Sequence, residues 1–249
     1  MGDEGRSFVT SGVEAFLEAA GEMGVGHGPG VAGTVEAWFH YYESWPGRRV
    51  VGFSDVRDIA VKLIADSFAI ERAIDCPYTD EGMRAIDLGS GNGWPGLAVK
   101  ALRPRAQLAL LDSRLGACRF LEGFVEYAGL RDVEIVPWRA EKAAKQAEYS
   151  GKYDLVTTRA MARPGVSLEL SVPFCRQQGK VALWLGPEDA AQIGQKTEIP
   201  ELGVRLGDVH EYVLAGGKGR RLLAVYTRTG DLARGFPRSL SAIKARPLF

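Results

Sequence analysis

Residues 85–96 read AIDLGSGNGWPG, a short apolar run that ends in a carboxylate and continues into four closely spaced glycines. Strand-forming residues lead up to this run, and apolar residues at helical spacing follow it: Leu97, Ala98, Ala101 and Leu102. The stretch therefore predicts a strand, a loop and a helix, in which small residues let a ligand approach backbone N–H groups.

The ligand class depends on one carboxylate. Residues 91–96 match the G-x-G-x-x-G pattern of dinucleotide-binding folds. Asp87 lies two residues before the first glycine, where it would repel a pyrophosphate. The same carboxylate favours the ammonium and sulfonium cations of S-adenosylmethionine (SAM). We expect SAM as the cofactor; the structural alternative is a glycine-rich turn in an α/β domain that binds no nucleotide.

A second apolar strand, residues 107–112, also ends in a carboxylate, Asp112. It follows the glycine loop by roughly 20 residues, the spacing at which a ribose diol finds its acceptor. Both carboxylates and the backbone of Gly89, Gly91 and Gly93 are therefore candidate cofactor-binding groups.

Composition limits the other possibilities. The chain has 249 residues and is 46% hydrophobic, enough for a large core. We expect a soluble cytoplasmic protein, because no apolar run approaches the 18 residues of a membrane span and the first 30 residues contain acids rather than a signal sequence. Neither the three histidines nor the cysteines Cys76, Cys118 and Cys175 have metal-ligand spacing, so we expect no metal and buried cysteines.

The charge is unevenly distributed, although the formal net charge is zero. Asp231 is the single acid from Lys218 onward, among eight basic residues: Lys218, Arg220, Arg221, Arg228, Arg234, Arg238, Lys244 and Arg246. This cluster predicts an RNA-binding patch. A merely solubilising surface is an equally good interpretation of the same residues.

The first 80 residues predict a small helical region. Residues 1–33 are glycine-rich and we expect them to be flexible, with a helical cap over residues 34–80. An aromatic stripe over residues 35–45 indicates core packing rather than base stacking. Ser54 is a plausible N-cap for a long amphipathic helix.

Strands and helices then alternate, which predicts an α/β fold with a doubly wound, mostly parallel sheet. The expected strands are residues 84–88, 107–112, 133–136, 153–157 and 179–185. The expected helices cover residues 95–102 and 115–128, and two more are expected, one that begins at about residue 141 and one that ends at residue 172. Residues 204–214 and 221–229 are joined by a connection too short for a parallel crossover, so we expect a C-terminal antiparallel hairpin. We predict a methyltransferase domain over residues 81–230 and a basic tail over 231–249.

The motifs together resemble the bacterial RsmG (GidB) family of 16S ribosomal RNA guanine-N7 methyltransferases. The resemblance rests on the glycine loop and on the following segments in the same order: Leu111-Asp112-Ser113, Phe120-Leu121, Arg139-Ala140-Glu141 and residues 153–160. Ile64-Ala65-Asp66-Ser67, Phe236-Pro237-Arg238 and Arg246-Pro247-Leu248 extend it over nearly everything after residue 34.

The resemblance implies roles for individual residues. Gly89 and Trp94 would line the SAM pocket, Ala140 and Glu141 would lie beside the adenine, and Arg159 would reach the cofactor. Arg159 could equally pair with Asp154 or Glu141, and Glu141 could be an ordinary helix-start acid.

The resemblance also implies the reaction, transfer of a methyl group from SAM to guanine N7 of 16S ribosomal RNA in the small subunit. Guanine N7 attacks without losing a proton, so we assign no catalytic residue. A flipped base needs a stacking platform, for which Trp94 and Trp184 are candidates. The chain departs from the family pattern near Gly52, Leu63 and Leu185, which leaves a small molecule or another RNA site as the alternative substrate.

Overall fold

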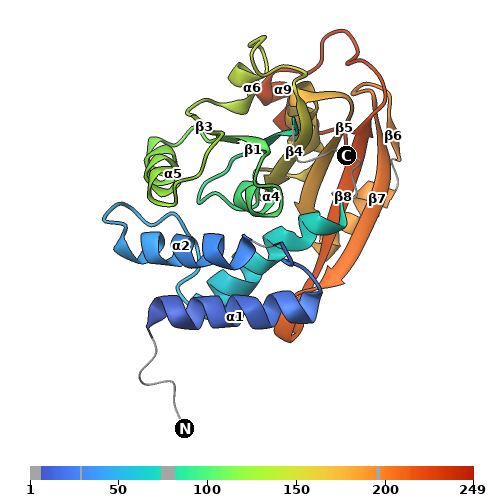
Figure 1. The fold of residues 1–249 in the computed structure, drawn as a ribbon. Coiled ribbons are helices and arrows are strands. Elements are labelled where there is room, and N and C mark those ends of the chain that lie inside the picture. Colours follow the sequence, from blue (N-terminus) through green and yellow to red (C-terminus); the bar gives the residue numbers. More distant parts are fainter. Residues whose placement is uncertain (1–6, 29, 74–81, 195–196) are drawn as a thin grey trace.

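The computed structural model describes residues 7–28, 30–73, 82–194 and 197–249, and one eight-stranded sheet dominates it (Figure 1). The strand order is β3-β2-β1-β4-β5-β8-β7-β6. The strands are β1 (Arg84–Leu88), β2 (Gln107–Leu111), β3 (Val133–Val136), β4 (Tyr153–Arg159), β5 (Cys175–Leu185), β6 (Glu198–Ile199), β7 (Val204–Val213) and β8 (Arg220–Arg228).

The topology confirms the predicted fold class. The first five strands pair in parallel, and β8 joins β5 antiparallel. β7 and β8 form the expected hairpin. The predicted strands agree with the observed ones to within about two residues, except that β5 begins at Cys175 rather than Gly179. The two-residue strand β6 was not predicted.

Helices cover both faces of the sheet. The helices are α1 (Phe8–Met23), α2 (Val31–Ser44), α3 (Val56–Asp58), α4 (Gly96–Leu102), α5 (Leu115–Tyr127), α6 (Ala140–Ala143), α7 (Pro164–Ser171), α8 (Ala190–Gly194) and α9 (Leu240–Ala245). One core cluster joins α1, α2, α4 and α5 to the sheet, and a second joins α6 and α7 to the other face. Figure 1 accordingly shows α1 and α2 on the side away from α6 and α9.

The N-terminal region is more ordered than the sequence predicts. Phe8–Met23 form α1, inside the segment for which we expect flexibility. Ser7 caps this helix, and Phe16 is fully buried because it packs on Phe68 at 5.4 Å between ring centroids. The aromatic stripe lies in the core as expected, with Trp38 and Phe39 fully buried in α2. The domain boundaries themselves stay predictions.

The helix after residue 54 differs from the prediction in two respects. Its N-cap is Asp55, whose carboxylate accepts from Asp58 N at 2.9 Å, so the assignment to Ser54 is wrong by one residue. After α3 the chain forms a π-helix, Ile59–Ala65, and a 3₁₀-helix, Phe68–Arg72, in place of one long α-helix. The Leu63 carbonyl of this π-helix accepts a hydrogen bond from Arg159 Nη1 of β4 at 2.8 Å.

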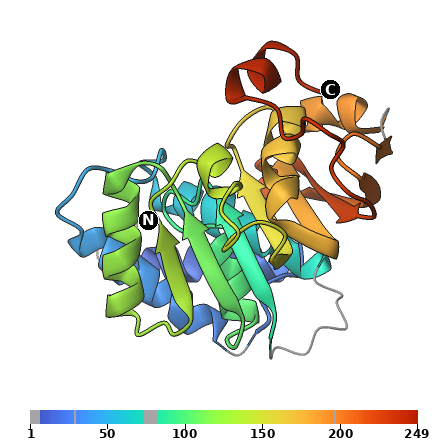
Figure 2. The ribbon, with the colours of Figure 1, turned by 90° about the horizontal axis from the view of Figure 1, so that it is seen from above.

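The C-terminal segment is anchored rather than free. The Arg238 guanidinium forms a two-pronged ion pair with Glu169 of α7, with Nη2 to Oε2 at 2.6 Å and Nε to Oε1 at 3.0 Å. The Glu169 side chain is fully buried. Ile243 of α9 packs on Val166 and Leu170, so that α9 lies beside α7, as Figure 2 shows in dark red.

Cys118 and Cys175 are free and buried, as the sequence predicts for small apolar residues. Burial raises the pKa of the Cys175 thiol to about 12, so this group remains protonated at neutral pH. Cys76 lies outside the described residues.

Removing the anchor should destabilise the fold. In Arg238→Ala the buried Glu169 carboxylate loses its charged partner and keeps only the hydrogen bond from the backbone N–H of residue 238. Breaking a buried ion pair on one side costs about 3–5 kcal/mol. Urea denaturation measures the free energy of unfolding. Arg234→Ala, an exposed cation in the same segment, is the matched control with an expected change below about 0.5 kcal/mol. Equal stability of the two variants would contradict the anchoring role.

Candidate functional site

The site lies where β1, β2 and β4 end, at the carboxyl edge of the parallel strands. The loop after β1 turns through Gly89, Gly91 and Gly93, whose φ angles are +73°, +56° and +100°. Side chains other than glycine rarely adopt this left-handed region. Gly96 has a different function, because a Cβ there would lie 2.5 Å from Leu110 Cδ2. The last glycine therefore lets α4 pack closely on the sheet.

Asp87 lies behind this loop. Its Oδ1 accepts a hydrogen bond from Thr157 Oγ1 at 2.7 Å, while its buried Oδ2 has no partner among the described residues. A Cβ on Gly96 would lie 2.8 Å from Asp87 Cβ, which places the side chain beneath the start of α4. Burial raises the pKa of Asp87 to about 7, against the opposing effect of the Thr157 hydrogen bond. A cation bound nearby would favour the ionised carboxylate.

Asp112 lies at the end of β2 and holds the loop from the other side. Its Oδ2 accepts from Gly91 N at 2.9 Å, and its Oδ1 accepts from Arg114 N at 2.8 Å. The Arg114 guanidinium adds Nη2 to Oδ2 at 3.0 Å and Nε to Oδ1 at 3.2 Å. The carboxylate is thus buried and fully paired.

Two pockets meet beside the loop, and Gly89 and Ala162 line both of them. The smaller has a volume of about 230 Å³ and is lined by Asp112, Ala140 and Glu141, with further residues from α7 and α9. The larger has a volume of about 540 Å³ and is lined by Gly91, Trp94 and Arg159, together with residues of the N-terminal helices and β5. A ligand spanning both would pass Gly89, where no side chain blocks the way.

The structure thus brings together seven of the nine predicted cofactor residues. Gly89, Asp112, Ala140 and Glu141 line the smaller pocket, while Gly91, Trp94 and Arg159 line the larger, which Gly89 also borders. Asp87 and Gly93 line neither. Gly93 is a packing position as well as a turn, because a Cβ there would lie 2.4 Å from Leu97 Cδ1.

Arg159 does not have the partners that the sequence suggests. Its Nη1 donates to Leu63 O at 2.8 Å and to Asp66 Oδ2 at 3.2 Å, and its Nη2 donates to Trp94 O at 3.3 Å. Asp154 instead accepts from Arg84 N and from Arg176. Arg159 therefore joins β4 to the π-helix and to the glycine loop at the wall of the larger pocket.

The two candidate stacking tryptophans are both buried. Trp94 is 3% exposed and Trp184 is 5% exposed. Trp184 Nε1 donates to Asp66 O at 2.9 Å, which fixes the ring as part of the wall. A stacking platform needs an open face, so neither ring is suited to that role. Phe53, partly exposed, lines the same pocket.

The basic C-terminal residues do not form one patch. Lys218, at the hairpin tip, pairs with Asp58, and Arg220 pairs with Glu211. The hairpin tip lies beside α1, whereas α9 with Lys244 lies at the other end of the molecule (Figure 1). Arg221 differs from its neighbour in lining the larger pocket, as do Lys62 and Arg114. The prediction that these residues gather into one basic patch is therefore wrong, whereas RNA binding by individual residues of the set stays a prediction.

Sequence reasoning missed several residues of these pockets. Arg114 and Met161 follow the ends of β2 and β4, and the rule that sites form at carboxyl ends of parallel strands would have found them. Leu240 and Lys244 of α9 line the smaller pocket from a segment with no local motif.

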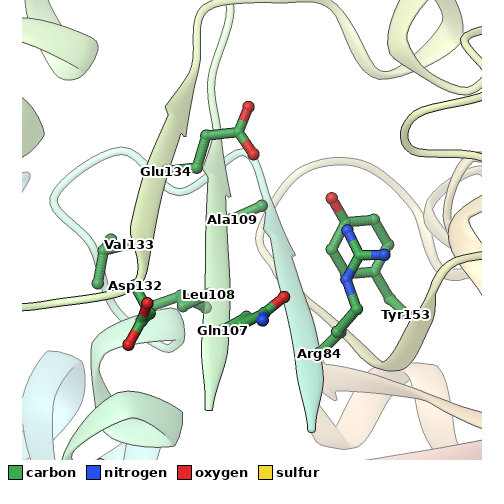
Figure 3. Close-up of a pocket in the computed structure, with 8 residues that line it drawn as sticks. All are labelled: Arg84, Gln107, Leu108, Ala109, Asp132, Val133, Glu134 and Tyr153. Carbon is green, nitrogen blue, oxygen red and sulfur yellow. The ribbon is translucent and has the colours of Figure 1, made fainter. Parts of the chain in front are cut away.

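A further pocket, of about 280 Å³, lies at the opposite edge of the sheet (Figure 3). It includes Arg84 and Gln107, the first residues of β1 and β2, and the Arg84 guanidinium lies over the Tyr153 ring at 5.2 Å from its centroid. No residue of the glycine loop lines it. Ligands of open α/β sheets bind at the carboxyl edge instead, so this pocket is not the candidate site.

Within the described ranges, no group of three or more His, Cys, Asp and Glu residues could hold a metal ion. The same part of the chain has no helix long and apolar enough to cross a membrane.

The family model and the relatives found by sequence agree on one family. The family model described as "rRNA small subunit methyltransferase G" matches residues 47–212. A protein of that name from Carboxydothermus hydrogenoformans is 33% identical over 192 residues, covering 77% of this chain and 80% of the relative. A protein of the same name from Symbiobacterium thermophilum is 30% identical over 238 residues, covering 93% of this chain and 96% of the relative.

Solved structures support the fold. The structure of TYW2 from M. jannaschii in complex with AdoMet is similar at a TM-score of 0.50 and 11% identity, covering 71% of this chain and 77% of that one. At this identity the similarity concerns the fold alone.

The Asp87 carboxyl should make stability depend on pH. Its folded pKa of about 7 lies above the unfolded value of about 3.9, so the fold favours the protonated form. Its contribution is fully present below about pH 4 and is lost as the pH rises to about 7. Relative to Asp87→Asn, the wild type should lose on the order of 3 kcal/mol between pH 4 and pH 8. Urea denaturation across this range checks it, and a pH-independent difference would contradict it.

Proposed function

Because the chain belongs to the rRNA small subunit methyltransferase G family, we propose that it transfers the methyl group of SAM to guanine N7 of 16S ribosomal RNA in the small subunit. The observation that carries the proposal is the pair of pockets that meet at Gly89. One has the carboxylate that a ribose requires, and the other has the cations that RNA requires.

The smaller pocket suits the adenosine half of SAM. Asp112 offers carboxylate oxygens to the ribose hydroxyls. Ala140, at the start of α6, leaves space for a flat ring, and Glu141 lies next to it at the pocket wall. Gly89 lies where the two pockets meet, and a Cβ there would come into contact with Met161, 3.5 Å from its Cγ, so a side chain at this position would narrow the passage.

The larger pocket suits the methionine half and the target base. The backbone of Gly89 and Gly91 borders it. Asp87, behind the loop, would act on the methionine ammonium through its charge rather than through direct contact, because it lines neither pocket. Arg159 would hold the wall in place through its bonds to Asp66 and Trp94 O.

SAM supplies a methyl group activated by a sulfonium. Guanine N7 has an in-plane lone pair and carries no proton, so the chain need not provide a general base. Its residues act by holding the base and the cofactor in line and by excluding water. This is consistent with a pocket whose walls are buried tryptophan rings and an arginine already paired with Asp66.

Asp112→Asn should weaken the binding of S-adenosylhomocysteine. The variant retains an acceptor for Gly91 N but loses the charge-assisted bonds to the ribose, each worth about 1.5–3 kcal/mol. We expect affinity to fall at least about tenfold by calorimetry. Asp208→Asn, on exposed β7, is the control, and unchanged affinity of Asp112→Asn would remove Asp112 from the site.

The reaction is tested with small subunits that lack the modification. Labelled SAM, 30S particles, naked 16S RNA and a metabolite extract are incubated with the protein, and the products are digested to nucleosides. We expect 7-methylguanosine from the 16S RNA. Label found only in a small molecule, or in another nucleoside, would overturn the assigned substrate.

Neighbouring arginines provide a matched pair for the RNA contact. Arg221→Ala removes a cation of the larger pocket, whereas Arg220→Ala removes one that pairs with Glu211. We expect the first to raise KM for RNA and to lower the salt slope of RNA binding by about one, and the second to leave both nearly unchanged. Equal effects of the two variants would contradict a phosphate contact at Arg221.

A further inference from the structure

The Asp112 carboxylate has no acceptor site left for a ligand. A carboxylate offers about four lone-pair positions. Four donors fill them here: Gly91 N, Arg114 N, Arg114 Nε and Arg114 Nη2, at 2.8–3.2 Å. A ribose diol that binds this carboxylate must therefore replace two of them.

Only the guanidinium can leave. The two backbone N–H groups are fixed by the glycine loop and by the start of α5. The Arg114 side chain, in contrast, is 70% exposed, while Asp112 is 5% exposed. Only the guanidinium of this pair is exposed, so water solvates it on release, while ligand hydroxyls can replace its hydrogen bonds to the buried carboxylate.

The released side chain stays at the substrate entrance. A Cβ on Gly91 would lie 3.1 Å from Arg114 Nη2, which places the guanidinium across the glycine loop. Arg114 lines the 540 Å³ pocket, together with Lys62 and Arg221, and does not line the smaller one. Its charge is therefore available on the side where RNA would enter.

We propose that Arg114 is a positioning residue that couples the two substrates: the SAM ribose displaces its guanidinium from Asp112, and the freed guanidinium then binds an RNA phosphate. The inference rests on the function proposed above. Arg114 opposes cofactor binding in the absence of RNA and strengthens RNA binding once the cofactor is present. By linkage, each ligand then raises the affinity for the other by the same factor.

The first test is cofactor affinity, measured by calorimetry with S-adenosylhomocysteine. Arg114→Ala retains the backbone donor to Asp112 and removes the competing guanidinium, so we expect about two- to fivefold tighter binding than wild type. Arg114→Lys retains the positive charge but lacks the paired guanidinium N–H groups that hold Asp112, so this variant should also bind S-adenosylhomocysteine more tightly than wild type. Arg119→Ala, an exposed cation on α5 that lines neither pocket, should not differ from wild type.

The second test is RNA affinity, measured on 16S RNA over a salt titration with and without S-adenosylhomocysteine. We expect the wild type to bind RNA about two- to fivefold more tightly when the cofactor product is present. Arg114→Ala should lose this gain, with a salt slope in the presence of the product reduced by about one. A residue that only supported the loop would change neither the coupling nor the slope.

The outcomes separate this inference from the proposed function. If wild-type protein binds no S-adenosylhomocysteine, the proposed function and the inference about Arg114 are both contradicted. If it binds, and Arg114→Ala binds equally or more weakly, the inference alone is overturned. Coupling that persists in Arg114→Ala also overturns it.

Discussion

The buried ion pair between Asp66 and Arg159 joins the two parts of the molecule that enclose the site. Asp66 ends the π-helix of the N-terminal region, and Arg159 ends β4. The carboxylate also accepts from Tyr212 OH at 2.6 Å, and its backbone oxygen accepts from Trp184 Nε1. Three strands of the sheet thus hold one acidic residue. A weaker polar contact, from Asn92 Nδ2 to Val50 O at 3.4 Å, joins the same two parts elsewhere on the pocket wall.

Burying that pair has an electrostatic consequence for the pocket. Burial raises the pKa of Asp66, and the Arg159 guanidinium and Tyr212 hydroxyl oppose the rise by favouring its charged form. Because Arg159 is already engaged, it adds rigidity rather than a free positive charge. The cations at the entrance that could face a polyanion are Arg114, from the connection between β2 and α5, and Arg221 of β8; Lys62, beside them, pairs with Asp58.

The two carboxylates of the site, Asp87 and Asp112, differ in how many hydrogen-bond donors surround them. Asp87 has one buried oxygen without a partner within the described chain, so its ionised form is disfavoured and its charge state responds to a nearby cation. Asp112 has four donors, so its geometry is already set. A carboxylate whose acceptor positions are all filled, as those of Asp112 are, can bind a ligand only if the ligand replaces one of its present donors. In the site that we propose, the side chain of Arg114 is therefore one of the groups that the cofactor meets.

The sequence by itself determined the strand–loop–helix unit, the glycines at positive φ and the carboxylates at the ends of β1 and β2. These are local properties, since backbone periodicity and the left-handed turn depend on residues close together in the chain. Only the tertiary structure decided the partners of Arg159 and the place of α9 beside the smaller pocket. Arg159 and Asp66 are 93 residues apart, and the pairing of such groups depends on how the elements pack. Eight basic residues in one sequence segment could therefore not reveal that the fold separates them.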